Sequence, residues 1–162
     1  MAMKTVYVET SVVSYLTAKP SSDLLAAAMQ KVTVDWWDTH RSRFELFTSE
    51  VTVEEARKGN PEAAVRRLAA LSGIPRLAVT DPVVRLSKAL LQKGVLPQKA
   101  LGDSLHIAVA AVHGLGYLLT WNCRHIDNAE IKPIVRKICA LEGLMCPEIC
   151  TPQELSGVVD DV

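Results

Sequence analysis

Two short apolar runs, each ending in polar side chains, constrain the fold of this chain more than any other feature. The first is residues 6–15, VYVETSVVSY, and the second is residues 117–124, YLLTWNCR. Runs of β-branched and aliphatic residues of this length are typical of strands buried on both faces. The carboxyl ends of neighbouring parallel strands form the crevice in which α/β proteins bind ligands. If the two runs are adjacent strands, Glu9 and Asn122 lie at the same rim.

Strand-like and helix-like segments alternate along the chain. The pattern predicts five strands, at residues 4–8, 44–49, 76–79, 117–121 and 146–151. It predicts helices at residues 10–16, 24–40, 51–58, 62–71, 81–92, 100–113 and 131–142. This alternation is typical of a three-layer α/β/α sandwich with a central parallel sheet of about five strands. We expect a single domain over residues 1–155 and a frayed tail at 156–162.

Composition narrows the classes of protein that fit. The chain of 162 residues is long enough to bury an ordinary core without disulfides. Its formal net charge is zero, so an RNA partner would need a local basic patch or bridging metal ions. The four cysteines lack paired C-x-x-C spacing, and we expect buried thiols in a reducing cytoplasm. No apolar stretch reaches the length of a membrane span, so no membrane partner is expected.

Acidic side chains at the ends of the predicted elements are the candidate functional groups. Glu54, Glu55 and Asp103 fall near helix starts, where the helix dipole favours acids, so each also fits a cap or a solvated charge. Glu9 is different, because a carboxylate at the end of a buried strand is costly unless it is paired or bound to a metal. No basic residue is adjacent to Glu9 in the sequence. A shared metal ion is the simplest explanation.

Four segments, in order, resemble the PIN domain: VYVETSVVSYL, SEVTVEEARKG, ALGDSLHIAVA and LLTWNCRHI. The similarity extends from residue 4 to residue 155. Within that family, the chain resembles the bacterial VapC-like proteins that are the toxin ribonucleases of type II toxin–antitoxin pairs. The resemblance implies a metal-dependent ribonuclease fold with a parallel sheet and an acidic pocket at the carboxyl edge of that sheet.

The resemblance also implies a set of site residues. The positions that match the family motifs are Glu9 with Thr10, Glu55, Asp103, and Thr120 with Asn122. Glu55 matches the second motif better than Glu54 does, because Gly59 follows it by four residues. We therefore expect Glu9, Glu55, Asp103 and Asn122 to be catalytic.

Two departures from the family pattern affect the expected metal site. Glu9 replaces the usual Asp and adds a methylene, and Asn122 supplies an oxygen without a charge. The remaining three acids suit one hard divalent ion, either Mg²⁺ or Mn²⁺. We expect Glu9 and Asp103 to be the principal metal ligands and Glu55 to orient the attacking water. Thr10 and Asn122 are expected to hold the hydration shell.

Several further residues are candidates for support of the site. His106 lies three residues after Asp103 on the same helical face, where it either contacts substrate, supports Asp103, or is a satisfied histidine at the core edge. Arg124 and His125 follow Asn122 and are candidates for phosphate contact. The sequence alone does not locate an RNA groove among its scattered basic residues.

Three functions fit this pattern to different degrees. The favoured one is a divalent-metal-dependent endoribonuclease that cleaves single-stranded RNA, forms a homodimer and is neutralised by a cognate antitoxin. The alternative is a PIN-like module that binds RNA or protein without cutting, because Glu9 and Asn122 weaken its site. A receiver or small nucleotide-binding domain fits poorly, because no Gly-rich loop follows the first strand and no late strand ends in Lys.

Overall fold

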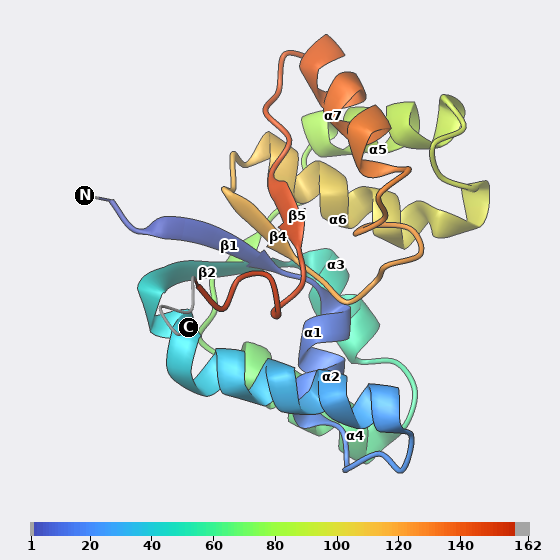
Figure 1. The fold of residues 1–162 in the computed structure, drawn as a ribbon. Helices are drawn as coiled ribbons and strands as arrows, with labels where there is room; N and C mark the ends of the chain where they lie inside the picture. Colours follow the sequence, from blue (N-terminus) through green and yellow to red (C-terminus); the bar gives the residue numbers. More distant parts are fainter. Residues whose placement is uncertain (1, 158–162) are drawn as a thin grey trace.

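A five-stranded parallel sheet forms the centre of the protein in the computed structural model, which describes residues 2–157 (Figure 1). The strands are arranged in the order β3-β2-β1-β4-β5. Their bounds are β1 Lys4–Val8, β2 Phe44–Ser49, β3 Arg76–Leu77, β4 Tyr117–Leu119 and β5 Glu148–Cys150. The predicted α/β class and the all-parallel sheet are confirmed.

Helices cover both faces of the sheet and complete the three layers that the sequence predicted. In Figure 1, α5 Asp81–Gln92, α6 Leu101–Val112 and α7 Lys132–Leu141 lie on one face. The opposite face carries α1 Thr10–Thr17, α2 Leu24–Asp35 and α4 Pro61–Leu71, while α3 Glu50–Ala56 follows directly after β2. Alternate residues of β1 point to the two faces, so Tyr7 packs in the core under α6 while Val6 and Val8 pack in the other.

The central strand β1 has the two neighbours that matter for the site. It pairs with β2 on one side and β4 on the other, with Val8 opposite Leu119. The predicted adjacency of the two apolar runs is therefore confirmed. The Glu9 backbone N–H donates to the Leu119 carbonyl at 3.1 Å, and α1 begins at the next residue. Glu9 thus lies between the last residue of β1 and the first residue of α1, as the N-cap of that helix.

The long helix predicted at residues 24–40 differs from the structure. The α-helix ends at Asp35, and a π-helical turn, Trp36–His40, follows it, with the Arg41 N–H bonded to the Trp36 carbonyl. Both tryptophans are buried although they are consecutive. Neighbouring positions on an α-helix point about 100° apart, and we attribute the wider turn to the burial of two large rings on one side.

The remaining differences are small. β4 ends at Leu119 rather than at residue 121, because the Trp121 N–H bonds to the Ser11 side chain instead of a strand. The four cysteines are free thiols, with Cys139 and Cys150 buried as expected and Cys123 exposed. Within residues 2–157, no helix is long and apolar enough to cross a bilayer. Residues 158–162 of the predicted frayed tail lie outside the described residues, so that expectation stays a prediction.

Candidate active site

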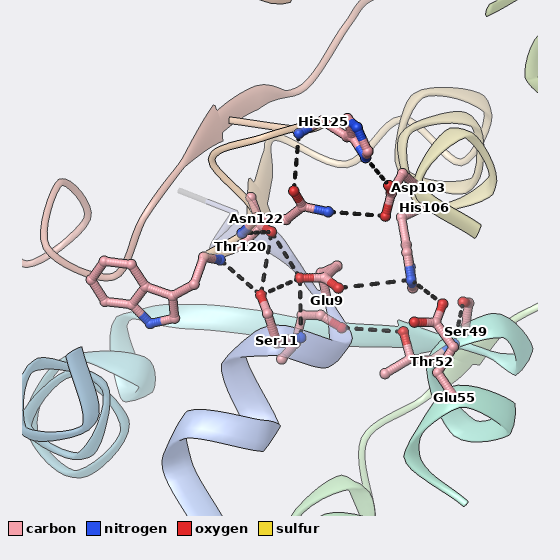
Figure 2. A network of polar contacts seen from close by, with 12 residues as sticks. Glu9, Ser11, Ser49, Thr52, Glu55, Asp103, His106, Thr120, Asn122 and His125 are labelled. Carbon is pink, nitrogen blue, oxygen red and sulfur yellow. Dashed lines mark hydrogen bonds and ion pairs between the residues drawn. The ribbon is translucent and has the colours of Figure 1, made fainter. Parts of the chain in front are cut away.

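Glu9 is buried at the carboxyl end of β1 and is held there by hydroxyl groups. Its Oε2 accepts hydrogen bonds from the Ser11 N–H at 3.1 Å, from the Ser11 hydroxyl and from the Thr120 hydroxyl at 2.7 Å. Only 4% of Glu9 is exposed. The Ser11 hydroxyl also accepts from the Trp121 N–H at 2.8 Å, which ties the start of α1 to the end of β4. The second carboxylate oxygen, Oε1, is left to face His106 (Figure 2).

His106 lies between two carboxylates in the interior of the protein. Its Nε2 is 2.6 Å from Glu55 Oε1 and 3.9 Å from Glu9 Oε1. Its Nδ1 is 2.7 Å from the Tyr7 hydroxyl, which in turn lies 2.6 Å from the Ser49 hydroxyl. The ring is fully buried, so its orientation is fixed by these contacts. The histidine is therefore the group that joins the end of β1 to α3.

Burial and the neighbouring charges have opposing effects on the pKa values of His106 and Glu55. Burial acts to lower the pKa of His106, but the Tyr7 oxygen, the Glu55 hydrogen bond and the two carboxylate charges raise that pKa well above its ordinary 6.5. Burial acts to raise the pKa of Glu55, whereas the hydrogen bond and charge of His106 bring it below its ordinary 4.5. A nitrogen and a carboxylate oxygen 2.6 Å apart share a proton, so Nε2–H donates to Glu55.

Asp103 belongs to a neighbouring but separate group of contacts. Its Oδ1 accepts from the Asn122 amide at 2.9 Å, and its Oδ2 lies 2.8 Å from His125 Nδ1. The Asn122 side-chain oxygen accepts from the His125 N–H at 3.0 Å, which closes the group. Figure 2 shows this trio from α6 and the segment after β4, beside the Glu9–His106–Glu55 group. The pairing of Glu9 with Asp103 as metal ligands stays a prediction.

A groove of about 700 Å³ opens next to these residues. Thr10, Glu55 and Asp103 line it, together with the basic side chains of Lys58 and Lys99. The Thr10 hydroxyl is buried and has no hydrogen-bond partner among the described residues. A buried hydroxyl without a partner is uncommon and calls for a water or an ion. The groove therefore joins acidic groups, an unused hydroxyl and two cationic side chains.

The donor atoms present fit a divalent cation. One ligand atom from each of Glu9, Glu55 and His106 lies within 4.8 Å of the other two. His106 Nε2 lies 2.6 Å from Glu55 Oε1 and 3.9 Å from Glu9 Oε1. Two atoms bound to one ion at about 2.0–2.2 Å lie at most about 4.4 Å apart. Of these three residues, Glu55 lines the groove together with Thr10. Carboxylate oxygens and an imidazole nitrogen are ligands that divalent metals accept in proteins.

The predicted site residues divide into three groups in the structure. Glu9, Glu55 and His106 are brought together directly, and Thr120 supports Glu9. Asp103, Asn122 and His125 form the adjoining trio, with His125 bound to a carboxylate. Arg124 is exposed on the loop after β4.

Two residues that contact the site were not predicted from the sequence, Ser11 and Tyr7. Ser11 follows a strand-end acid, the position from which a hydroxyl can reach that acid, whereas only the packing of α6 on β1 reveals Tyr7.

No protein-family model matches the chain, and no curated protein matches its sequence. Solved structures do match its fold. VapC20 of Mycobacterium tuberculosis, a toxin that cleaves the sarcin–ricin loop, superposes with a TM-score of 0.54 and 20% identity, over 70% of this chain and 86% of that one. A chain of VapBC2 from Rickettsia felis, solved with a DNA fragment from their promoter, gives a TM-score of 0.56 at 13% identity, over 91% and 98%. VapBC-1 from nontypeable Haemophilus influenzae gives 0.56 at 12% identity, over 92% and 98%. These likenesses confirm the PIN-type fold.

Proposed function

We propose that this chain, which has the fold of VapC toxin structures, is a divalent-metal-dependent endoribonuclease that cleaves single-stranded RNA. The observation that carries the proposal is the convergence of Glu9 and Glu55 at the carboxyl end of the central strand, beside a groove that also holds Asp103. An acidic cluster at this edge of a parallel sheet is where α/β proteins place their ligand sites. The unpartnered Thr10 hydroxyl supports a ligand at the same place.

The proposed roles follow from the contacts of each side chain. A bound divalent ion supplies charge neutralisation at the phosphate and a water of lowered pKa. Glu9 holds the ion with Oε1, because Oε2 is already occupied by Ser11 and Thr120. Glu55 is half-buried at the groove, and it would orient the attacking water with the carboxylate oxygen that does not face His106. Asp103 would act through water, because it lies in the neighbouring group with Asn122 and His125.

Basic side chains near the acids give the proposed RNA a place to bind. The chain has no net charge, so attraction to phosphate must be local. Lys58 and Lys99 line the groove that Glu55 and Asp103 also line. Arg124, exposed on the loop after β4, extends this basic character toward Asn122. Cationic side chains beside an acidic centre hold a phosphodiester that the acids alone would repel.

The decisive experiment compares two adjacent glutamates of α3. Glu55→Gln keeps the shape of the side chain but removes its charge, and we expect it to lower Mn²⁺- or Mg²⁺-dependent cleavage of single-stranded RNA by about 10²-fold or more. Glu54→Gln is the matched control. Glu54 also lines the groove, but it is exposed and paired with Arg57 rather than with His106, so its cleavage should fall far less than that of Glu55→Gln. Asp103→Ala should also lose cleavage.

Circular dichroism and thermal unfolding establish that each variant is folded. Wild-type cleavage rates in Glu55→Gln and Asp103→Ala would contradict the proposed site. Cleavage that persists in EDTA would contradict the metal requirement. A folded wild-type protein that binds RNA but does not cut it with either ion would instead support a PIN-like binding module.

The proposal includes partners and a location. We propose a homodimer and a cognate antitoxin, on the strength of the resemblance to VapC-like toxins and of the shared fold. We also propose that the protein acts in the cytoplasm, where it would meet a single-stranded RNA substrate. Light scattering of the purified protein tests the dimer, and a monomer at micromolar concentration would contradict it. Growth arrest on expression, relieved by the gene product encoded next to it, tests the antitoxin.

A further inference from the structure

We propose that His106 is itself a metal ligand, so that Glu9, Glu55 and His106 form a mixed oxygen–nitrogen site that binds Mn²⁺ in preference to Mg²⁺. This inference rests on the proposed metal dependence and names the class of ion. His106 Nε2 lies 2.6 Å from Glu55 Oε1 and 3.9 Å from Glu9 Oε1. One ligand atom from each of the three lies within 4.8 Å of the others. In the metal-free protein a proton lies between Nε2 and Glu55, and a metal ion would take its place while that proton leaves to solvent.

The far side of the ring has the support that metal-bound histidines need. A ligating histidine usually gives its second ring nitrogen to an oxygen, which fixes the ring and selects the tautomer. His106 Nδ1 lies 2.7 Å from the Tyr7 hydroxyl, and that hydroxyl lies 2.6 Å from Ser49 and 3.2 Å from Thr52. Because the ring is fully buried, it cannot turn away from Glu9 and Glu55. Nε2 is therefore presented to the acidic pair.

A second observation points to a ligand at this cluster. Thr10 is only 9% exposed, and its hydroxyl makes no hydrogen bond of ordinary geometry among residues 2–157, although it lies close enough to the Glu55 carboxylate to help lower its pKa. Thr10 lines the groove with Glu55. Asp103 lies in the neighbouring group, where its oxygens contact Asn122 and His125. The ligand atoms that lie close enough together to share one ion are two carboxylate oxygens and one imidazole nitrogen, from Glu9, Glu55 and His106.

This donor set determines the preference among ions. Mg²⁺ is a hard ion that demands near-ideal octahedral oxygen coordination and gives up its waters reluctantly. An imidazole ligand suits first-row transition ions better than it suits Mg²⁺. Mn²⁺ shares the affinity of Mg²⁺ for carboxylate oxygen, and as a first-row transition ion it accepts an imidazole nitrogen more readily than Mg²⁺ does. We therefore expect calorimetry to give a Kd for Mn²⁺ at least about tenfold below that for Mg²⁺.

The test reads nitrogen coordination directly rather than through activity. Electron spin-echo envelope modulation of the Mn²⁺-loaded full-length protein should show coupling to a histidine nitrogen, which changes when the histidines are labelled with ¹⁵N. His106→Gln should lose this coupling and bind Mn²⁺ about tenfold or more weakly, with a smaller change for Mg²⁺. His125→Gln is the matched control, because His125 bonds to Asp103 rather than to Glu9 or Glu55, and its coupling should persist.

The outcomes separate this inference from the proposed function. Mn²⁺ binding without nitrogen coupling in the wild-type protein overturns it, as does coupling lost in His125→Gln but kept in His106→Gln. The labelled wild-type spectrum decides nitrogen coordination even when His106→Gln does not fold. Nitrogen coupling without RNA cleavage upholds the inference while contradicting the nuclease proposal. Cleavage that Mg²⁺ supports as well as Mn²⁺ does, with no nitrogen coupling, contradicts the inference while upholding the nuclease proposal.

Discussion

Ser11 is the side chain that most directly holds Glu9 in place. Its hydroxyl and N–H both donate to Glu9 Oε2, and the hydroxyl also accepts from the Trp121 N–H. Ser11→Ala leaves a buried carboxylate and a backbone N–H with fewer partners, so we expect a loss of about 1–2 kcal/mol in the free energy of unfolding. Urea titration of the wild type and the variant measures this loss. Ser14→Ala, three residues along α1, is the control and should change stability by less.

The same residues show how far sequence reasoning reached at this scale. Glu9 could be singled out from the sequence alone because a buried acid at the end of a strand requires a reason. Its neighbour Thr120 was found through the motif. His106 was placed on the correct helical face, but its two carboxylate partners lie 51 and 97 residues away. Contacts over such separations depend on how α6 packs against β1 and α3, which periodicity does not encode.

At the scale of elements, Gly102 marks where α6 approaches α3. A Cβ at this position would lie 3.3 Å from Glu55 Oε1. Gly102→Ala improves helix propensity by about 0.5–1 kcal/mol, so we expect the free energy of unfolding to stay within about 1 kcal/mol of the wild-type value. The Glu55 carboxylate must move by a few tenths of an ångström, and we expect RNA cleavage to fall by about tenfold.

Paired measurements of unfolding and of cleavage check this prediction on the same preparation. A variant that is strongly destabilised would show that the backbone, rather than the Glu55 side chain, yields to the new methyl group. A stable variant with wild-type cleavage would show that the position of Glu55 is not critical.

The elements themselves were largely predictable, and the exceptions have physical causes. β1 and β2 have the predicted bounds, because both are short apolar runs closed by polar residues. The turn at Trp36–His40 was not predicted, because the choice between α- and π-helical bonding depends on where two large rings are buried. The end of β4 was misplaced by two residues, because the Ser11 side chain takes the Trp121 N–H.

For the whole molecule, the raised pKa of His106 predicts a pH dependence of stability in the metal-free protein. The pKa in the folded state lies above the ordinary 6.5, so this group stabilises the fold fully below pH 6.5 and loses that effect as pH rises through the folded pKa. Glu55 has a lowered pKa, so its contribution is present above pH 4.5 and is lost as pH falls through its folded pKa.

Denaturant titrations across this pH range, in the presence of EDTA, measure the effect. The wild-type free energy of unfolding should decline above pH 6.5 relative to that of His106→Gln, which has no imidazole to lose its proton. Histidine NMR gives the pKa of His106 independently. A titration at or below its ordinary value would contradict the prediction.

The position of β1 at the centre of the sheet also governs when the site comes into being during synthesis. Glu9 is synthesised well before Thr120, and the hydrogen bond between them spans 111 residues of chain. Until β4 has emerged, β1 has only one neighbour, and Asp103 and His106 have no finished sheet on which to pack. Contacts of such long range form late and slowly. The acidic centre therefore arises only after α6 and β4 have both been synthesised and have packed against β1.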